Sequence, residues 1–193
     1  MDSPNDGLRV VNITKSFSRK IVAVENVTFG VPRGEVFALL GPSGAGKTTT
    51  INMIRGDLAP NNGEIFVENI PVTRRRAEAK SHPGVCPQFD AMDLMTAVGH
   101  LRFYPQVRGV KDVGQNASQV IRAVSLEAFQ SRMGEKLSGG NKRKLSLGIA
   151  FMGNPTVLLL DEPSSGMDAA SKRTMWKTLA DVQKGRSLVQ TTH

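Results

Sequence analysis

Three features are scarce in this 193-residue chain: cysteine, long apolar runs and clustered aromatic side chains. The single cysteine, Cys86, excludes an internal disulfide framework and favours a reducing compartment. No run approaches the roughly 18 apolar residues that a membrane-spanning helix needs, and the N-terminus lacks the basic-then-apolar order of a signal peptide. There is no low-complexity tract or internal repeat. With 39% hydrophobic and 22% charged residues, the composition indicates one ordered globular domain.

The net charge of +8 is compatible with nucleic acid, an acidic membrane face or a polyphosphate nucleotide as partner. The basic residues are dispersed, with short clusters only at residues 74–76 and 142–144. No aromatic side chains interleave with them, since Tyr104 and Trp176 are single and far apart. We therefore interpret both clusters as solvated faces and expect no nucleic-acid partner.

Strand-like and helix-like runs alternate along the chain, which predicts an α/β fold with a mostly parallel sheet and an N-terminal antiparallel β part. A region with helical spacing, about residues 90–135, interrupts this order as an insertion within one domain spanning residues 1–193, with breaks expected at Pro105, Gly109 and Gly114. The last predicted strand ends with the chain, so we expect a C-terminal truncation. Strands are predicted at residues 8–14, 21–29, 35–40, 64–70, 156–162 and 187–193, and helices at residues 49–55 and 169–182.

The stretch GPSGAGKT at residues 41–48 matches the phosphate-binding pattern G-x-x-x-x-G-K-[ST]. Its glycines let backbone N–H groups close around a phosphate, Lys47 reaches the terminal phosphates, and Thr48 offers a hydroxyl to Mg²⁺. The loop follows an apolar strand and opens a helix, whose positive end faces the anion. The residues expected to bind the nucleotide here are Gly41, Pro42, Ser43, Gly44, Ala45, Gly46, Lys47, Thr48 and Thr49.

An acidic pair follows the apolar run VLLL at residues 157–160. A buried strand of an open α/β sheet presents such residues at its carboxyl end, where ligands bind. Asp161 is expected to hold Mg²⁺, and Glu162 to act as the general base that polarises the attacking water.

Several further polar or aromatic residues gain interest from these two motifs. Gln88, in CPQFD, is a candidate to contact Mg²⁺ or the attacking water, and His193 is a candidate contact for the γ-phosphate. Phe17 is a candidate to stack on the base. His82 and His100 have no such placement, so we expect structural roles for them.

Together these motifs resemble the ATP-binding domain of ABC transporters. The resemblance covers essentially the whole chain and rests on the phosphate loop, Gln88, LSGG at residues 137–140, VLLLDE at residues 157–162, SGMD at residues 165–168 and His193. The segments GVCPQFD, LSGGNKRKLS and DEPSSGMD are most similar to those of the A subfamily, whose members are typically lipid exporters. Asn141 supports this, because most ABC domains have Gln there.

The resemblance implies a P-loop NTPase (RecA-like) fold and an ATPase that works as a face-to-face pair of domains around two ATP molecules. Ser138, Gly139 and Gly140 would bind the γ-phosphate held by the other domain. Phe17 would stack on adenine, and Asp168 would lie in the loop that couples the two sites. The implied partners are a second ATP-binding domain and transmembrane domains that dock on residues 88–108 and carry a lipid-type substrate, with this domain on the cytoplasmic face of a membrane.

Two alternatives remain at this point. One is a soluble ABC ATPase of the translation or chromosome-maintenance type, although the insertion of about forty residues carries no heptad run of a coiled coil. The other is an ordinary P-loop kinase or GTPase, in which LSGGN and SGMD would have no purpose.

Overall fold

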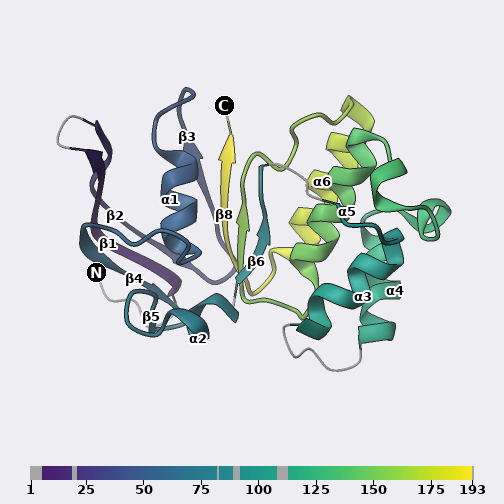
Figure 1. The fold of residues 1–193 in the computed structure, drawn as a ribbon, viewed down its shortest axis with the longest axis horizontal. Coiled ribbons are helices and arrows are strands. Elements are labelled where there is room, and N and C mark those ends of the chain that lie inside the picture. Colours follow the sequence, from purple (N-terminus) through teal and green to yellow (C-terminus); the bar gives the residue numbers. More distant parts are fainter. Residues whose placement is uncertain (1–5, 19–20, 82, 89–91, 108–112, 193) are drawn as a thin grey trace.

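The structure, a computed structural model, describes residues 6–18, 21–81, 83–88, 92–107 and 113–192. Its strands form two sheets, one antiparallel with the order β2-β1-β4-β5 and one parallel with the order β3-β8-β7-β6 (Figure 1). The antiparallel sheet contains β1 (Asp6–Ser18), β2 (Ile21–Pro32), β4 (Asn62–Val67) and β5 (Ile70–Pro71). The parallel sheet contains β3 (Val36–Leu40), β6 (Pro83–Cys86), β7 (Val157–Leu160) and β8 (Ser187–Thr192).

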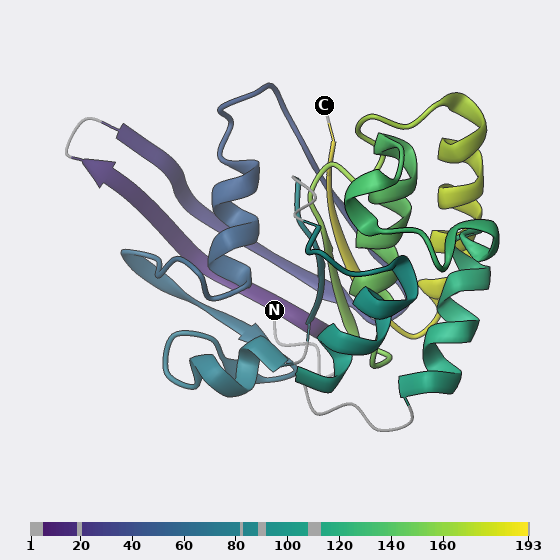
Figure 2. The ribbon, with the colours of Figure 1, turned by 45° about the vertical axis from the view of Figure 1, so that its right-hand side comes forward.

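The helices separate into two groups on either side of the parallel sheet. Figures 1 and 2 show α1 beside the antiparallel sheet, whereas α3 to α6 gather on the opposite side of the molecule. The helices are α1 (Lys47–Ile54), α2 (Arg76–Ser81), α3 (Ala97–Val107), α4 (Val113–Ala123), α5 (Gly139–Phe151) and α6 (Ala169–Val182), with 3₁₀ turns η1 (Glu127–Phe129) and η2 (Gly134–Lys136).

Alternation along the parallel strands builds two hydrophobic cores, one on each face of the sheet. Leu158 and Leu160 of β7 pack into the core shared with α3 to α6. Their neighbours Val157 and Leu159 face the other way, into the core that α1 shares with β1 and β2. Because side chains alternate along a strand, the fully apolar sequence of β7 is what lets one strand serve both cores.

The predicted elements are recovered with few changes, including the helix at residues 169–182 and the N-terminal antiparallel part. The predicted single strand at residues 64–70 is wrong, because Glu68 and Asn69 adopt left-handed φ angles of 51° and 64° and turn the chain from β4 into β5. Two consecutive left-handed residues are the signature of a tight hairpin turn. The break expected at Pro105 is also wrong, since α3 continues through it to Val107.

Strand β3 does not have the burial that its apolar sequence predicts. It pairs only with β8 among the described strands and lies at the edge of the parallel sheet. Val36 and Leu40 are 43% and 70% exposed.

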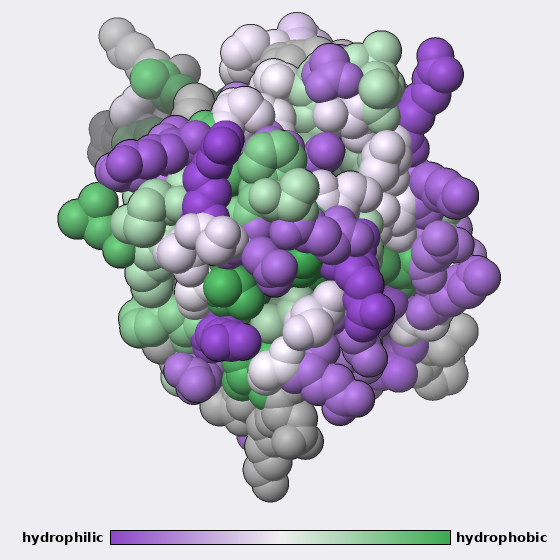
Figure 3. Space-filling view, turned by 90° about the vertical axis from the view of Figure 1, so that its right-hand side faces the viewer, coloured by the Kyte–Doolittle hydropathy of each residue, from purple (hydrophilic) through white to green (hydrophobic). Residues whose placement is uncertain are grey.

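The surface over the helical group is mostly hydrophilic, and its hydrophobic side chains gather in small patches between charged ones (Figure 3). Within the described ranges, no helix combines the length and the apolar sequence required to cross a bilayer.

Gly84 provides a direct test of how the helical group packs on the sheet. A Cβ atom there would lie 1.9 Å from the carbonyl oxygen of Ala150 and 2.8 Å from Cγ of Pro155. We expect Gly84→Ala to push α5 away from β6 and to lower the free energy of unfolding by about 1–3 kcal/mol in urea titrations. Gly114→Ala is the control, since a Cβ there meets nothing within 4 Å. An equal loss in both variants would contradict this packing.

Candidate active site

The phosphate loop, residues 41–48, adopts a conformation that needs glycine at particular positions. Gly44 and Gly46 have φ angles of 82° and 85°, in the left-handed region that other residues avoid. A Cβ on Gly46 would also lie 2.2 Å from the carbonyl oxygen of Ala23 in β2, so the loop packs tightly against the antiparallel sheet. The pattern therefore has its glycines where backbone geometry requires them.

Helix α1 begins directly at Lys47, so its free N–H groups and positive end face the loop. The Lys47 side chain is only 9% exposed. Its ammonium group donates to the carbonyl oxygens of Gly41 at 2.6 Å and Pro42 at 3.0 Å. The cation is thereby held beside the loop, where an incoming phosphate would meet it.

A cavity of about 160 Å³ lies against this loop and brings the separate motifs together. Gln88, which follows β6, and Glu162, which follows β7, both line it. The two strands are parallel neighbours, so their carboxyl ends open at the same edge of the sheet. The described residues lining the cavity are Ala23, Ser43, Gly44, Ala45, Gly46, Lys47, Thr48, Thr49, Gln88 and Glu162.

The acidic pair lies just beyond β7, and β8 holds it in place. The backbone N–H of Glu162 donates to Oγ1 of Thr191 at 2.8 Å, and this hydroxyl donates to Oδ1 of Asp161 at 2.6 Å. Asp161 is 3% exposed and is not among the described residues lining the cavity. Glu162 has a φ of 48°, a strained value costing roughly 1 kcal/mol that the surrounding hydrogen bonds maintain. Glu162 therefore lines the cavity, whereas Asp161 is buried beside it.

The sequence analysis did not identify Thr191 or Ala23 as residues of the site. A threonine in an apolar strand carries no distinctive signal, and Thr191 becomes informative only when the topology places β8 beside β7. Ala23 contributes through its backbone, which leaves no trace in a sequence pattern. His193 lies outside the described residues, so its predicted role stays a prediction.

Phe17 lies on β1 and is 59% exposed. The Lys15 ammonium lies 5.9 Å from the centre of its ring. Phe17 is not among the described residues lining the cavity, although Ala23 of the paired strand β2 is. Its stacking on adenine stays a prediction, for which an exposed ring on that hairpin is available.

Ser138, Gly139 and Gly140 stand at the N-terminus of α5, apart from the described lining of the cavity. The Ser138 hydroxyl accepts from the Asn141 backbone N–H at 3.4 Å and caps the helix. A Cβ on Gly139 or Gly140 would meet nothing within 4 Å, and neither has a left-handed φ. This chain's own fold therefore does not require glycine at either position.

Asp168 is the N-cap of α6. Its carboxylate accepts from the backbone N–H groups of Ala170 and Ser171, both at 2.9 Å, and from the Ser171 hydroxyl at 2.8 Å. These bonds, led by the Ser171 N–H, lower the pKa of Asp168 below its usual range. The cap is thus stabilising above the ordinary carboxyl pKa and weakens as the pH falls through the lowered value. Its predicted role in coupling two sites stays a prediction.

His100 has the structural role expected for it. It is fully buried, Nε2 accepts from the Asp93 backbone N–H at 3.0 Å, and Nδ1 donates to the Thr96 carbonyl oxygen at 2.9 Å. Both ring nitrogens are therefore occupied. His82 lies outside the described residues.

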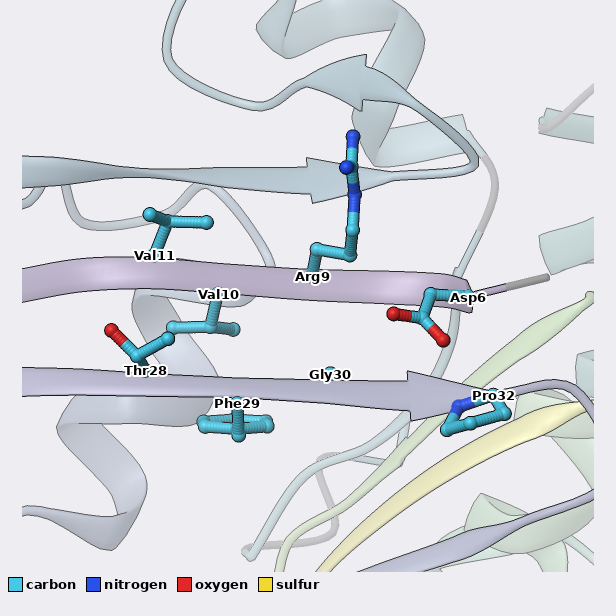
Figure 4. Close-up of a pocket in the computed structure, with 8 residues that line it drawn as sticks. All are labelled: Asp6, Arg9, Val10, Val11, Thr28, Phe29, Gly30 and Pro32. Atoms are coloured by element: carbon cyan, nitrogen blue, oxygen red, sulfur yellow. The ribbon is translucent and has the colours of Figure 1, made fainter. Parts of the chain in front are cut away.

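A second hollow, of about 300 Å³, lies along β1 and β2 away from the phosphate loop (Figure 4). Of its described lining, Asp6 and Arg9 alone carry charge, and the Arg9 guanidinium lies 4.8 Å from the centre of the Phe66 ring on β4. The two charged side chains lie apart in Figure 4, and Arg9 is directed toward β4. Nothing in this hollow matches the chemistry of the cavity at the phosphate loop.

Thr191 tests how far the acidic pair depends on β8. In Thr191→Val the Glu162 N–H and Oδ1 of Asp161 lose the hydroxyl that serves both. We expect unfolding free energy to fall by about 1–3 kcal/mol, because buried polar groups are left unsatisfied. Thr191→Ser, which keeps the hydroxyl, should lose less than half as much in the same urea titration. A loss in Thr191→Ser as large as that in Thr191→Val would mean that the γ-methyl group contributes as much to stability as the two hydroxyl hydrogen bonds, and would contradict this account.

Comparisons with known proteins agree with this geometry. The sequence profile described as "ABC transporter" matches residues 24–165. The chain is 42% identical over 198 residues to the human glucosylceramide transporter ABCA12, covering 97% of this chain and 8% of that protein. It is 42% identical over 200 residues to the rat ATP-binding cassette sub-family A member 2 (100% and 8%), and 40% identical over 193 residues to the mouse retinal-specific phospholipid-transporting ATPase ABCA4 (97% and 8%). The chain thus spans under a tenth of these relatives' length.

Solved structures with the same fold include one described as the ATP-binding subunit of an ABC transporter, with a TM-score of 0.87 and 27% identity over 96% of this chain and 79% of that one. Another is the ATP-binding cassette MJ0796, described as a dimer bound to ADP and Pi, with a TM-score of 0.87 and 24% identity over 96% and 88% of the two chains. The relatives' names do not favour the soluble, non-transport alternative. The chain belongs to the ABC transporter family, as an ATP-binding ATPase domain most similar to those of the A subfamily.

Proposed function

We propose that this chain is one half of a paired ATPase motor that moves a lipid-type substrate across a membrane. The observation that carries the proposal is a split between two sets of residues. The phosphate loop, Gln88 and Glu162 share one cavity, whereas Ser138 to Gly140 form a separate helix end, at which a Cβ atom on either glycine would meet nothing within 4 Å.

ATP binding is the first step. The loop's N–H groups and the α1 N-terminus receive the phosphates, and Lys47 supplies a positive charge. For Mg²⁺, the candidate ligands are Thr48, Gln88 and Asp161, whose hydroxyl, amide and carboxylate oxygens suit an ion that takes few protein ligands and otherwise binds phosphates and water. Bound there, Mg²⁺ would neutralise charge on the phosphates.

Hydrolysis is assigned to Glu162 acting as the general base. Its carboxylate accepts a proton from the water that attacks the γ-phosphate, and Gln88 orients this water from the neighbouring loop. The backbone of Glu162, held at a strained φ by the Thr191 hydroxyl, supports this role, because a catalytic group on an ordered backbone needs less reorganisation when the reaction begins.

The second half of each site is proposed to come from another ATP-binding domain. The fold of this chain does not require glycine at the two positions that start α5. The absence of side chains there would let a phosphate approach the backbone N–H groups and the positive helix end. The Ser138 hydroxyl stands beside them. Each ATP would then lie between the phosphate loop of one domain and Ser138 to Gly140 of the other.

Transmembrane domains are the proposed partners that convert this pairing into transport, with the chain on the cytoplasmic face of the membrane. Within the described part of residues 88–108, Leu94 and Phe103 are 78% and 47% exposed, which supports an apolar docking surface there. The lipid-type substrate is supported by relatives whose names state glucosylceramide and phospholipid transport.

Glu162→Gln separates binding from chemistry. We expect nucleotide affinity to stay within about threefold, since the amide keeps the shape of the side chain, while the hydrolysis rate falls at least about 100-fold. Fluorescent-nucleotide binding and phosphate release measure the two effects. Glu127→Gln, on η1 away from the cavity, is the control and should leave both unchanged. Unchanged hydrolysis in Glu162→Gln would remove this residue as the base.

Gly139→Asp tests the contribution of α5 to the opposite site. A carboxylate facing the γ-phosphate of the other domain should lower hydrolysis more than about tenfold through repulsion, while nucleotide binding to the phosphate loop stays intact. Gly114→Asp introduces the same charge into the first turn of α4, in equally open space, and should leave hydrolysis unchanged. An equal loss of nucleotide binding in Gly139→Asp would contradict a role in the opposite site.

A further inference from the structure

Arg143 is the largest fully buried side chain of the described residues, with 2% exposure, although it stands in the basic cluster at residues 142–144. The expectation that this cluster is a solvated face is therefore wrong for its central member. Arg143 lies in the second turn of α5, and its side chain points into the protein where β6 and β7 end.

The Arg143 guanidinium donates to the backbone carbonyl oxygens of two loops. Nη1 contacts the oxygens of Pro87 and, at 3.4 Å, Gln88, which follow β6. Nη2 contacts those of Asp161 and, at 2.8 Å, Glu162, which follow β7. Nε donates to the oxygen of Pro163 at 3.1 Å. A guanidinium has five N–H groups in a rigid plane, and five carbonyl oxygens of the described residues surround this one.

These contacts begin where the strand pairing stops. The last ladder bond between the two strands runs from the Asp161 N–H to the Cys86 carbonyl oxygen at 2.9 Å. From Pro87 and Asp161 onward, the guanidinium links the two chain segments through their carbonyl oxygens. Because it bonds the main chain of both Gln88 and Glu162, it fixes the separation of the two residues assigned to the attacking water.

The same side chain belongs to the helix that begins with Gly139 and Gly140. Arg143 is four residues from Gly139, about 6 Å along the helix axis, so both move with α5 as one rigid element. A displacement of the start of α5 would therefore also displace the loops that carry Gln88 and Glu162, because Arg143 bonds both of them.

We propose that Arg143 is a positioning residue that holds Gln88 and Glu162 at a fixed separation. When a nucleotide on the opposite domain binds the start of α5, Arg143 would carry the resulting shift of the helix to these two residues. The inference rests on the proposed function, and it adds a route by which occupation of one site sets the geometry of the other. Lysine cannot replace the arginine, since its ammonium has three N–H groups and no planar fork.

Arg143→Lys is the first test, carried out on the chain at protein concentrations where its hydrolysis rate per chain no longer rises. We expect the variant to remain folded at the assay temperature, with nucleotide affinity within about threefold of wild type and KM little changed. The kcat should fall at least about tenfold, because small misplacements of catalytic groups are costly. The Hill coefficient for ATP should fall from about two toward one as the sites uncouple.

A second variant distinguishes positioning from simple structural support. Arg143→Ala leaves room for a free guanidinium ion, and its addition at non-denaturing concentrations should restore part of the lost kcat. Arg122→Lys and Arg122→Ala, at an exposed arginine of α4, should show neither the loss nor the rescue.

Three results would overturn the inference: a kcat of Arg143→Lys within about twofold of wild type, a loss no larger than the loss of folded protein, or unfolding of this variant at the assay temperature. Wild type and Glu162→Gln are measured alongside. If wild type hydrolyses ATP and Glu162→Gln does not, the proposed role of Glu162 in hydrolysis stands whatever Arg143 shows. Absence of hydrolysis in wild type would overturn the proposed function and this inference with it.

Discussion

Two hydrogen-bonding side chains, Thr191 from β8 and Arg143 from α5, hold the main chain of Glu162 by its N–H and its carbonyl oxygen respectively. This double tie keeps a non-glycine residue at a φ of 48°, which no local preference of glutamate would maintain. It also fixes the main chain of Glu162 at the edge of the parallel sheet. The first tie requires that β8 lies beside β7, and the second requires that α5 packs where β6 and β7 end. The position of the proposed base is therefore determined by elements packed around β7, and not by the sequence of the loop that carries the base.

The remaining architecture places the phosphate loop against that fixed point. Gly46 packs so closely on Ala23 of β2 that the antiparallel sheet supports the loop from one side, while α1 supports it through the second core. The N-terminus of α5 is different, since it is capped by Ser138 yet a Cβ atom on either of its glycines would meet nothing within 4 Å. A helix end that is ordered but unoccupied by its own chain suits a partner, and the proposed ATP between two domains supplies one. Arg143 would then connect that partner's nucleotide with the local base.

Much of this could be predicted from the sequence, because the phosphate loop and the acidic pair are local patterns whose chemistry depends on adjacent residues. The α/β order was equally accessible, and so was α6 with both its ends. Thr191 and Arg143 were not found, since their partners are distant in sequence and known only once the strand order is fixed. A weak signal for Arg143 did exist: it precedes the apolar Leu147 by four residues and so shares its helix face. The turn at Glu68 and Asn69 was missed because neither residue is glycine, although Asn tolerates the left-handed region.

The central claim, that each ATP site is built from two domains, is tested most directly in a tandem chain of two copies joined by a flexible linker, which keeps them at high effective concentration. One version carries Lys47→Ala and Gly139→Asp in the same copy, and the other carries them in different copies. With sites shared between copies, the first version has no intact site and the second has one. The account predicts ATP hydrolysis from the second version and none above background from the first. Hydrolysis from the first version and none from the second would contradict it.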